Sequence, residues 1–345
     1  MKLARLDVRR FEVSLRRSLV TSAGTLRERR GFLVRVADAE GNVGLGEASP
    51  AYWLGDESLE HVESVVQDLQ GVVGADDPLA GLDEWRLRSP SVACALETAC
   101  LDLEGRRREV SVAELLGGVG GREVPVSALL FGGVPDAVAR TAASLAELGH
   151  PAVKLKVGAG DVADDVQRLE SIRAVCGAGL AVRLDANRAW SVGKARKALT
   201  ALKPFGPAFV EEPLTGGTPV EWRSLRTEIG VPLAGDESIP NLPTLRAFAE
   251  ARALDVVVLK PARLGGPTAV LDVAREAARF GITVVVTDSI ETSVGRALAA
   301  HVAAALPGEV QPIGLGGASV LESDPHGLVP VQLPRLRVSG PGLGL

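Results

Sequence analysis

The sequence predicts an α/β fold, in which a (β/α)-barrel follows a smaller α+β domain. Two observations lead to this prediction. Between Lys154 and Lys260, short apolar runs end in ionisable residues at steps of about 25 residues, the length of one strand–helix unit. Two of these runs, DVVVLK and TVVVTDS, are continuously apolar, as expected for parallel strands that are buried on both faces.

Residues 1–120 are expected to form the α+β domain, which would cap the barrel. Alternating segments LDVRRFEVSL, GFLVRVAD and VGLGEASP predict an antiparallel meander. Between the first two lies the polar stretch SLVTSAGTLRERR, which we interpret as a long loop. It is either a solvated hairpin tip or a place where hydroxyls and arginines meet an anionic substrate. Helical spacing of apolar residues follows in 56–117.

Residues 121–317 contain eight strand candidates that alternate with helix candidates. This alternation predicts a parallel sheet with right-handed crossovers. No GxGxxG motif is present, which favours a closed barrel over a dinucleotide-binding sheet. The Gly/Pro-rich residues 318–345 are expected to pack back on the first domain. The predicted strands are VPVSALLF, AVKLKVG, LAVRLDAN, AFVEEP, PLAGDES, DVVVLK, TVVVTDS and QPIGLGG. The predicted helices are 136–149, 161–176, 194–202, 219–229, 241–252, 267–280 and 294–306.

Composition excludes several classes of partner. A net charge of −5 and a pI near 5.6 argue against nucleic acid or an anionic membrane as the main partner. No apolar run reaches the roughly 18 residues that a membrane span needs. Cys94, Cys100 and Cys176 lack metal-site spacing, so a reducing, cytoplasmic location is expected. His301, in ALAAHVAAAL, is expected to be a packed helix residue, and assembly into a homo-oligomer stays open.

Three carboxylates end neighbouring strand candidates at what would be the catalytic rim of the barrel. They are Asp185, Glu211 and Asp236. Close carboxylates repel one another unless a cation neutralises them. Oxygen ligands without His or Cys select a hard cation, which indicates Mg²⁺, with Mn²⁺ as the alternative. The competing interpretation is three separate salt bridges to the nearby lysines.

Lysines stand on both sides of these carboxylates in the sequence. Lys154 and Lys156 are two residues apart on one strand, so their side chains share a face. Two neighbouring ammonium groups near a divalent cation should lower each other's pKa, which would leave one amine free to act as a base. Lys260 would face them from across the barrel. This arrangement suits proton abstraction from a carbon next to a carboxylate. Solvent-facing lysines at strand ends are the alternative.

The set Lys154-Leu155-Lys156, LDAN, EEP, GDES and VLKPARLGG resembles the muconate-lactonizing subgroup of the enolase superfamily, over nearly the whole chain. The resemblance implies a modified (β/α)7β barrel with an N-terminal capping domain. It also implies that Lys156 is the base, that Lys154 assists it and that Lys260 is its partner on the opposite face. The implied Mg²⁺ ligands are Asp185, Glu211 and Asp236, with Asn187 and Glu237 beside them.

Within the subgroup, TSAGTLRERRGFLVRV, PSVACALETACLDL and TDSIETSVGRALAAHVAAALP look most similar to the o-succinylbenzoate synthase family. That resemblance implies Mg²⁺-dependent syn dehydration of 2-succinyl-6-hydroxy-2,4-cyclohexadiene-1-carboxylate in menaquinone biosynthesis, through an enediolate. N-succinylamino acid racemases, dipeptide epimerases and muconate cycloisomerases are the alternatives. Dipeptide epimerases usually carry an Asp-x-Asp pair near the eighth strand, where this chain has GLGGASV followed by Glu322 and Asp324.

A small-molecule carboxylate is therefore the expected partner, and further residues are candidates for binding it. Some come from the polar stretch of the capping domain and some from the ends of the last two barrel strands. The backbone N–H groups of the glycines around Gly316 are candidates for binding a carboxylate. The candidates are Ser22, Thr25, Arg27, Asn187, Ser289, Glu291 and Gly316.

Overall fold

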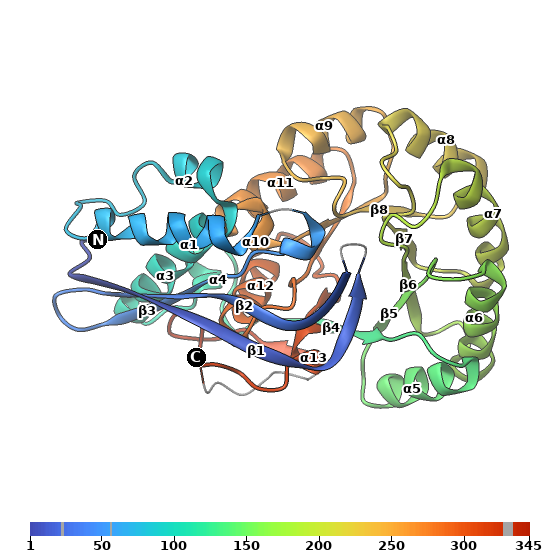
Figure 1. The fold of residues 1–345 in the computed structure, drawn as a ribbon, viewed down its shortest axis with the longest axis horizontal. Coiled ribbons are helices and arrows are strands. Elements are labelled where there is room, and N and C mark those ends of the chain that lie inside the picture. Colours follow the sequence, from blue (N-terminus) through green and yellow to red (C-terminus); the bar gives the residue numbers. More distant parts are fainter. Residues whose placement is uncertain (22–23, 56, 327–333) are drawn as a thin grey trace.

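The structure is a computed structural model, and it describes residues 1–21, 24–55, 57–326 and 334–345. Figure 1 shows a cap of N-terminal strands and helices on one side and a ring of strands and helices on the other. None of the helices in the described ranges combines the length and apolar character that a membrane crossing requires.

The cap is built on an antiparallel sheet in the order β1-β2-β3, formed by β1 (Arg5–Thr21), β2 (Gly24–Ala37) and β3 (Val43–Ala48). Helix α3 (Pro90–Arg108) packs against β3 at very short range. A Cβ added at Gly46 would lie 1.9 Å from the backbone O of Ala95, so only glycine permits this contact. The other cap helices are η1 (Tyr52–Leu54), α1 (Leu59–Gln67), η2 (Asp68–Val72), α2 (Leu82–Arg88) and α4 (Val112–Leu115).

The prediction of a long loop between the first two strands is wrong. Strands β1 and β2 continue to pair through it, from Leu19 opposite Leu26 to Thr21 opposite Gly24, with an irregular register between Ser14 and Leu19. Pairing of backbone groups needs no apolar alternation, so a polar sequence can extend a hairpin. Thr25 and Arg27 therefore lie on β2 with exposed side chains. The candidate Ser22 lies outside the described residues.

The predicted parallel barrel is confirmed. The strands pair in the order β10-β9-β8-β7-β6-β5-β4-β11, each parallel to its neighbour. Their bounds are β4 (Glu123–Leu130), β5 (Ala152–Lys156), β6 (Ala181–Asp185), β7 (Phe209–Glu211), β8 (Leu233–Gly235), β9 (Val256–Leu259), β10 (Thr283–Val286) and β11 (Ile313–Gly314).

The ring of strands is closed between its first and last members by a single bridge. Thr287, just after β10, pairs in parallel with Gly314 on β11. The backbone O of Gly314 accepts hydrogen bonds from Asp288 N and Thr287 Oγ1, both at 2.9 Å. A Cβ at residue 314 would lie 2.4 Å from Thr287 Oγ1, so the two strands approach this closely because residue 314 is glycine.

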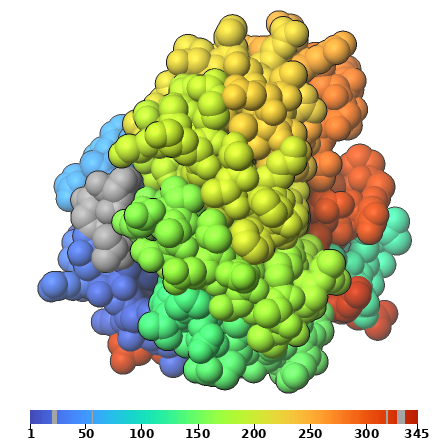
Figure 2. Space-filling view, turned by 90° about the vertical axis from the view of Figure 1, so that its right-hand side faces the viewer, coloured from blue at the N-terminus to red at the C-terminus, as the bar shows by residue number. Residues whose placement is uncertain are grey.

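Amphipathic helices cover the outside of the barrel and bury their apolar faces on its strands. Figure 2, seen from the barrel side, shows green to yellow helices forming this outer surface, with the blue cap at its edge. The helices that follow β4 in the chain, including the short α10 and α13 that contact the cap, are α5 (Pro135–Glu147), α6 (Val162–Cys176), α7 (Val192–Leu202), η3 (Lys203–Phe205), α8 (Pro219–Ile229), α9 (Leu242–Glu250), α10 (Pro261–Leu264), α11 (Pro267–Arg279), α12 (Ser293–Ala305) and α13 (Gly317–Val320).

The C-terminal segment contacts both parts of the molecule. Leu321 forms an antiparallel bridge with Leu15 of the cap hairpin. Strand β12 (Arg335–Arg337) pairs antiparallel with the first half of β4. Gly342 exchanges backbone hydrogen bonds with Val110 and Val112, next to α4. The domain boundary at residue 120 and the assignment of 318–345 to the cap stay predictions.

His301 should make the stability of the fold depend on pH. It is 2 % exposed on α12, and its Nδ1 accepts the N–H of Ala113 at 3.1 Å. Burial lowers the pKa of His301 from 6.5 to about 4. Between these two values the unfolded chain binds a proton that the folded chain does not, so the free energy of unfolding falls as the pH falls. We expect His301 to contribute about 2.5 kcal/mol of this loss between pH 7 and pH 4.5.

The comparison is a His301→Gln variant, which stays neutral throughout. Urea unfolding at pH 7 and at pH 4.5 should show a smaller stability loss for the variant than for the wild type. The same substitution at His61, on the exposed face of α1, is the matched control. Equal losses in the wild type and His301→Gln would contradict the prediction.

Candidate active site

The three predicted carboxylates end neighbouring parallel strands, and their side chains are buried. Asp185 ends β6, Glu211 ends β7 and Asp236 directly follows β8, with exposed fractions of 1 %, 2 % and 3 %. Asp185 pairs with Glu211 in the register of the sheet, and Glu211 pairs with Ala234 on β8. The structure therefore brings the predicted ligands together at one edge of the barrel, where the carboxyl ends of its strands meet.

Lysines hold these carboxylates. Lys154 Nζ lies 2.7 Å from both Asp185 Oδ2 and Glu211 Oε1, and so bridges two strands. Lys156 Nζ lies 2.6 Å from Asp185 Oδ2. On the other side Lys260, at the N-terminal end of α10, donates a hydrogen bond to Asp236 Oδ2.

Sheet order places the two sets of lysines on opposite walls. Lys154 and Lys156 lie on β5 and Lys260 follows β9, and these strands are four steps apart in a ring of eight. Strands half a circumference apart face each other across a closed barrel. A substrate carbon held over the carboxylates would have an amine on each of its two faces.

The predicted mutual lowering of the pKa values of Lys154 and Lys156, which depends on a nearby divalent cation, stays a prediction. Without the ion, the carboxylates dominate the pKa of Lys154 and of Lys260. Burial lowers the pKa of Lys154, but the charges of Asp185 and Glu211 outweigh burial and raise it above its usual value. For Lys260 burial also lowers the pKa, and Asp236 raises it by more. In each case the attraction of the adjoining carboxylates outweighs the cost of burying the ammonium group.

The carboxylates respond unequally to the same surroundings. Burial raises the pKa of Asp185, but Lys154 and Lys156 together bring it below the usual value. For Glu211, burial raises the pKa and the neighbouring charge of Asp185 raises it further, with only partial compensation from Lys154. Glu211 is the carboxylate of this group whose negative charge is least neutralised by its neighbours.

The chemistry of this donor set fits a hard divalent cation, since it consists of three buried carboxylates without sulfur or imidazole. Among the described residues, no three His, Cys, Asp or Glu side chains already have their donor atoms arranged to hold an ion. The ammonium groups of Lys154 and Lys260 explain this, because they hydrogen-bond the oxygens concerned.

Asn187 connects the two sides of the rim. Its Oδ1 accepts a hydrogen bond from Lys156 Nζ, and its Nδ2 donates to Glu237 Oε1 at 3.2 Å. Its backbone N–H donates to Asp185 Oδ1 at 3.0 Å. The structure thus places both Asn187 and Glu237 beside the carboxylates, and Asn187 fixes the direction of the Lys156 amine.

Two residues that sequence reasoning did not single out contact the residues at the rim of the barrel. Glu212, next to Glu211, is fully buried, and burial raises its pKa. Arg263 Nη1 lies 3.2 Å from Asp236 Oδ1, opposite the oxygen that Lys260 holds. The adjoining glutamates of EEP were a signal for Glu212, because one of two consecutive side chains at a strand end must face away from the rim.

Backbone strain is concentrated at this edge of the barrel. Asn187, Arg188 and Glu212 have φ values of 41°, 62° and 44°, in the left-handed region that non-glycine residues rarely adopt. Such conformations cost about 1–3 kcal/mol each and persist where surrounding contacts enforce them. Contacts made by the loops after β6 and β7 therefore offset the free-energy cost of these backbone conformations.

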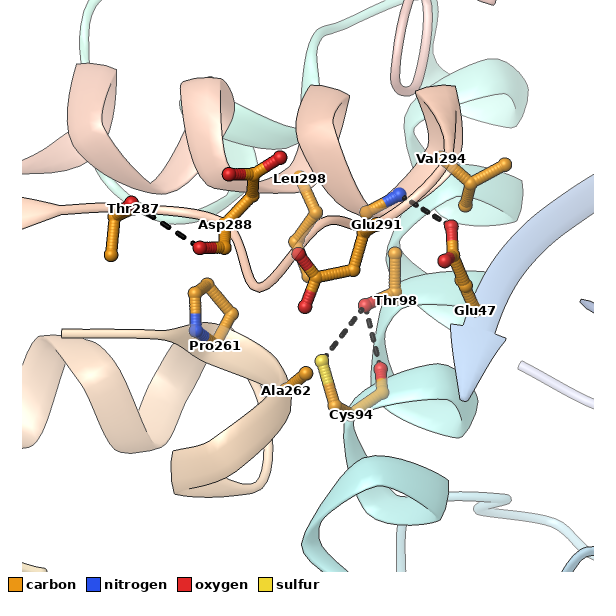
Figure 3. Close-up of a pocket in the computed structure, with 11 residues that line it drawn as sticks. Glu47, Cys94, Thr98, Pro261, Ala262, Thr287, Asp288, Glu291, Val294 and Leu298 are labelled. Carbon is orange, nitrogen blue, oxygen red and sulfur yellow. Dashed lines mark hydrogen bonds between the residues drawn. The ribbon is translucent and has the colours of Figure 1, made fainter. Parts of the chain in front are cut away.

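Glu291 lies in a cavity between the cap and the barrel. Figure 3 shows its carboxylate directed toward Pro261, Ala262 and Cys94. The cavity measures about 10 Å³, roughly the space of one water molecule, and Glu47 and Thr98 also line it. Burial raises the pKa of Glu291. Because Pro261 directly follows Lys260, Glu291 lies next to the helical turn α10 that begins after Lys260.

Arg29 and Glu47 join the cap to this region. Arg29 is completely buried and donates to the backbone O of Ile290, Ser49 and Pro50. Glu47 accepts hydrogen bonds from the backbone N–H groups of Thr292 and Gly295, both at 3.0 Å. Ser289, also buried, donates its backbone N–H to Glu291. The loop after β10 is therefore held by the cap.

At the opposite side of the rim, the cap hairpin reaches the first barrel strands. The guanidinium of Arg17 stacks on the ring of Phe131, just after β4, 3.0 Å from its centroid. Arg16 Nε donates to the backbone O of Leu321 at 2.9 Å. Gly316 lies near Leu129 of β4. These contacts place the cap hairpin over the end of β4, beside the strand that carries Lys154.

A capped barrel whose strand ends carry three acidic residues between opposed lysines defines a class of enzyme that removes a proton next to a carboxylate. Family models match both parts of the chain. Residues 5–117 match the mandelate racemase / muconate lactonizing enzyme N-terminal domain, and residues 137–345 match the enolase C-terminal domain-like family. The chain belongs to the enolase superfamily, in its muconate-lactonizing subgroup.

Its relatives include enzymes with different reactions. It is 27% identical to a hydrophobic dipeptide epimerase of Enterococcus faecalis over 313 residues, 88% of each chain. It is equally identical to an N-succinyl-L-Arg/Lys racemase of Bacillus cereus, over 88% of this chain and 84% of the relative. A chloromuconate cycloisomerase of Cupriavidus necator is 29% identical, over 89% and 85%.

A solved structure shows the same fold with a metal and a substrate. The dipeptide epimerase from Enterococcus faecalis, complexed with Mg and the dipeptide L-Leu-L-Tyr, superimposes with a TM-score of 0.88. The alignment covers 98% of this chain and 97% of that one, at 25% identity. The chain is therefore an enzyme of the superfamily, and its relatives act as epimerases, racemases and cycloisomerases.

Proposed function

We propose that this enzyme racemises an N-acylated amino acid by moving the proton on the carbon next to the carboxylate. The observation that carries the proposal is the placement of Lys156 and Lys260 on opposite walls, with the acidic group between them. A reaction on one face of a carbon needs a single base, whereas inversion of its configuration needs a proton donor on the face opposite the base. Lys156 and Lys260 would supply the base and the donor.

Asp185, Glu211 and Asp236 would hold one Mg²⁺, with Mn²⁺ as the alternative. When bound, the ion supplies positive charge that stabilises a substrate carboxylate as its α-carbon loses a proton. The protein's own share is positional. Lys156, directed by Asn187, takes the proton on one face, and Lys260 returns a proton on the other. Lys154 adds positive charge beside Lys156.

The surroundings of Asp324 favour an acylated nitrogen over the free amine of a dipeptide. Its Oδ2 accepts the backbone N–H of Ser293 at 2.8 Å and lies 3.4 Å from Arg296 Nη2. Its side chain is only 3 % exposed, and Glu322 is exposed on the surface. An acidic side chain committed to a helix start and a buried arginine is a poor partner for a substrate ammonium group. The relative that racemises N-succinyl-L-Arg/Lys supports the same substrate class.

Syn dehydration to 2-succinylbenzoate is the second candidate. It is favoured by the sequence segments that resemble the o-succinylbenzoate synthase family, and it would use the same lysine pair with Lys260 as a fixed cation. The relatives described above support racemisation or epimerisation better, since their names give epimerase, racemase and cycloisomerase activities.

The test uses purified protein with Mg²⁺ in deuterated water. N-succinyl amino acids of both configurations, dipeptides and the cyclohexadiene carboxylate are incubated separately, with EDTA controls. Proton NMR and chiral chromatography should show α-deuteration with loss of optical purity for N-succinyl amino acids. Mg²⁺-dependent loss of the cyclohexadiene absorbance, without α-deuteration of any N-acyl amino acid, would replace the proposal with the dehydratase.

A further inference from the structure

Glu212 is the centre of a hydrogen-bond group that ties together the loops after β6 and β8. Its Oε1 accepts the backbone N–H groups of Asp236 and Ser238, both at 2.7 Å. Its Oε2 accepts Ser238 Oγ at 2.8 Å and Arg188 Nε at 3.3 Å. A carboxylate that accepts four hydrogen bonds in a fully buried place uses both oxygens to fix neighbouring backbone.

The two loops that Glu212 holds carry the outer members of the acidic group. One begins with Asp185 and includes Asn187, which directs Lys156. The other begins with Asp236 and includes Glu237, the second partner of Asn187. Backbone hydrogen bonds add to the connection, since Arg188 N donates to Glu212 O at 2.7 Å. Glu212 itself comes from the strand between them, next to Glu211.

The strained backbone of these loops gives independent support. Asn187, Arg188 and Glu212 all have positive φ; Arg188 and Glu212 belong to this hydrogen-bond group, and Asn187 directly precedes Arg188. Without the carboxylate of Glu212, the loops would lose contacts that hold an unfavourable conformation. Their relaxation would move Asp185 and Asp236 relative to each other, since each is the first residue of its loop.

We infer that Glu212 is a positioning residue, which holds Asp185 and Asp236 at the spacing needed to share one divalent cation. The inference rests on the proposed use of these carboxylates as metal ligands. Residues that orient metal ligands typically change metal affinity by about 10–100-fold when removed. Glu212 acts through the backbone of its neighbours and does not touch substrate.

The test compares two substitutions. Glu212→Gln removes the charge, keeps an oxygen for the two backbone N–H groups and can donate to Ser238 Oγ, so only the Arg188 contact is lost. Glu212→Ala removes every side-chain contact and keeps the backbone hydrogen bonds. Mn²⁺ binding is measured by electron paramagnetic resonance and Mg²⁺ binding by calorimetry, on the full chain without substrate. We expect Glu212→Gln to bind Mn²⁺ within about threefold of wild type and Glu212→Ala at least about 10-fold more weakly.

The control is Glu228→Gln, which removes a half-exposed carboxylate paired with Arg196 on the barrel surface. It should bind Mn²⁺ as the wild type does. Circular dichroism and thermal unfolding identify folded variants. If Glu212→Ala does not fold, Glu212→Asp, which withdraws the carboxylate by one methylene, replaces it with the same expectation.

Three outcomes separate the possibilities. Wild-type affinity in the folded Ala or Asp variant overturns the inference, and so does equal weakening in Gln and Ala, which would show that charge alone acts. Wild-type protein that binds neither Mn²⁺ nor Mg²⁺ overturns the metal site itself, whatever Glu212 does. Weak binding in Ala with retained binding in Gln supports the inference even if racemisation of N-acyl amino acids is absent.

Discussion

Replacing Lys260 by alanine is expected to lower racemisation by about 10²–10⁴-fold and to leave α-proton exchange in one enantiomer. The enantiomer whose proton faces Lys156 still loses it and regains deuterium on the same face, so it returns labelled with its configuration unchanged. Lys156→Ala should give the mirror result. Proton NMR in deuterated water follows the exchange, and chiral chromatography follows the configuration.

The matched control is Lys197→Ala, at an exposed position of α7. It should racemise at the wild-type rate. Lys260→Arg keeps a cation beside Asp236 but removes the proton carrier, so its racemisation should fall as in Lys260→Ala. Exchange of both enantiomers in Lys260→Ala would rule out Lys260 as the second proton carrier. Substantial dehydration of the cyclohexadiene carboxylate by Lys260→Arg would point to the dehydratase.

Removal of Mg²⁺ is expected to lower the free energy of unfolding of the wild type. It should not change the stability of variants that lack Glu211. At 100 times its dissociation constant, Mg²⁺ raises the free energy of unfolding by about 2.7 kcal/mol. In Glu211→Gln that increment should vanish, because a neutral amide replaces the central ligand. Burial and the charge of Asp185 raise the pKa of Glu211, so the neutral side chain should not destabilise the metal-free protein.

Thermal or urea unfolding with Mg²⁺ and with EDTA measures both effects. Glu228→Gln, at a half-exposed carboxylate, should show the full wild-type increment. The same Mg²⁺ increment in Glu211→Gln and in the wild type would remove Glu211 from the metal site. A wild type that gains nothing from Mg²⁺ would remove the site altogether.

The barrel could be predicted because two of its strands are continuously apolar and because the strand candidates recur at a nearly constant interval. Val256–Leu259 and Thr283–Val286 contact helices on one face and the barrel interior on the other, so both faces are apolar. The interval between successive strands then indicated where the helices lie. The same reasoning could not find the extension of β1 and β2, since that hairpin is held by backbone pairing and carries polar side chains.

For the site, sequence predicted which residues meet but not how they interact. Asp185, Glu211 and Asp236 were placed together because successive parallel strands end at one edge. The shift of the Lys154 pKa without the ion could not be predicted, because the contacts with Asp185 and Glu211 depend on side-chain distances that spacing does not contain. Glu212 was missed for a similar reason, since its partners come from loops 24 residues away or more.

The single bridge at Gly314 makes the distance across the barrel depend on one missing side chain. A Cβ there would lie 2.4 Å from Thr287 Oγ1, so either that side chain turns away and loses its hydrogen bond to the backbone O of residue 314, or β10 and β11 separate. In a closed barrel the tilt and spacing of every strand depend on its neighbours, so a wider seam changes the whole circumference. The gap between the opposing amines of Lys156 and Lys260 would change with it. A displacement of about 1 Å can cost about 10²-fold in rate, so a substitution at residue 314 that widens this seam would lower the rate although the residue carries no reacting group.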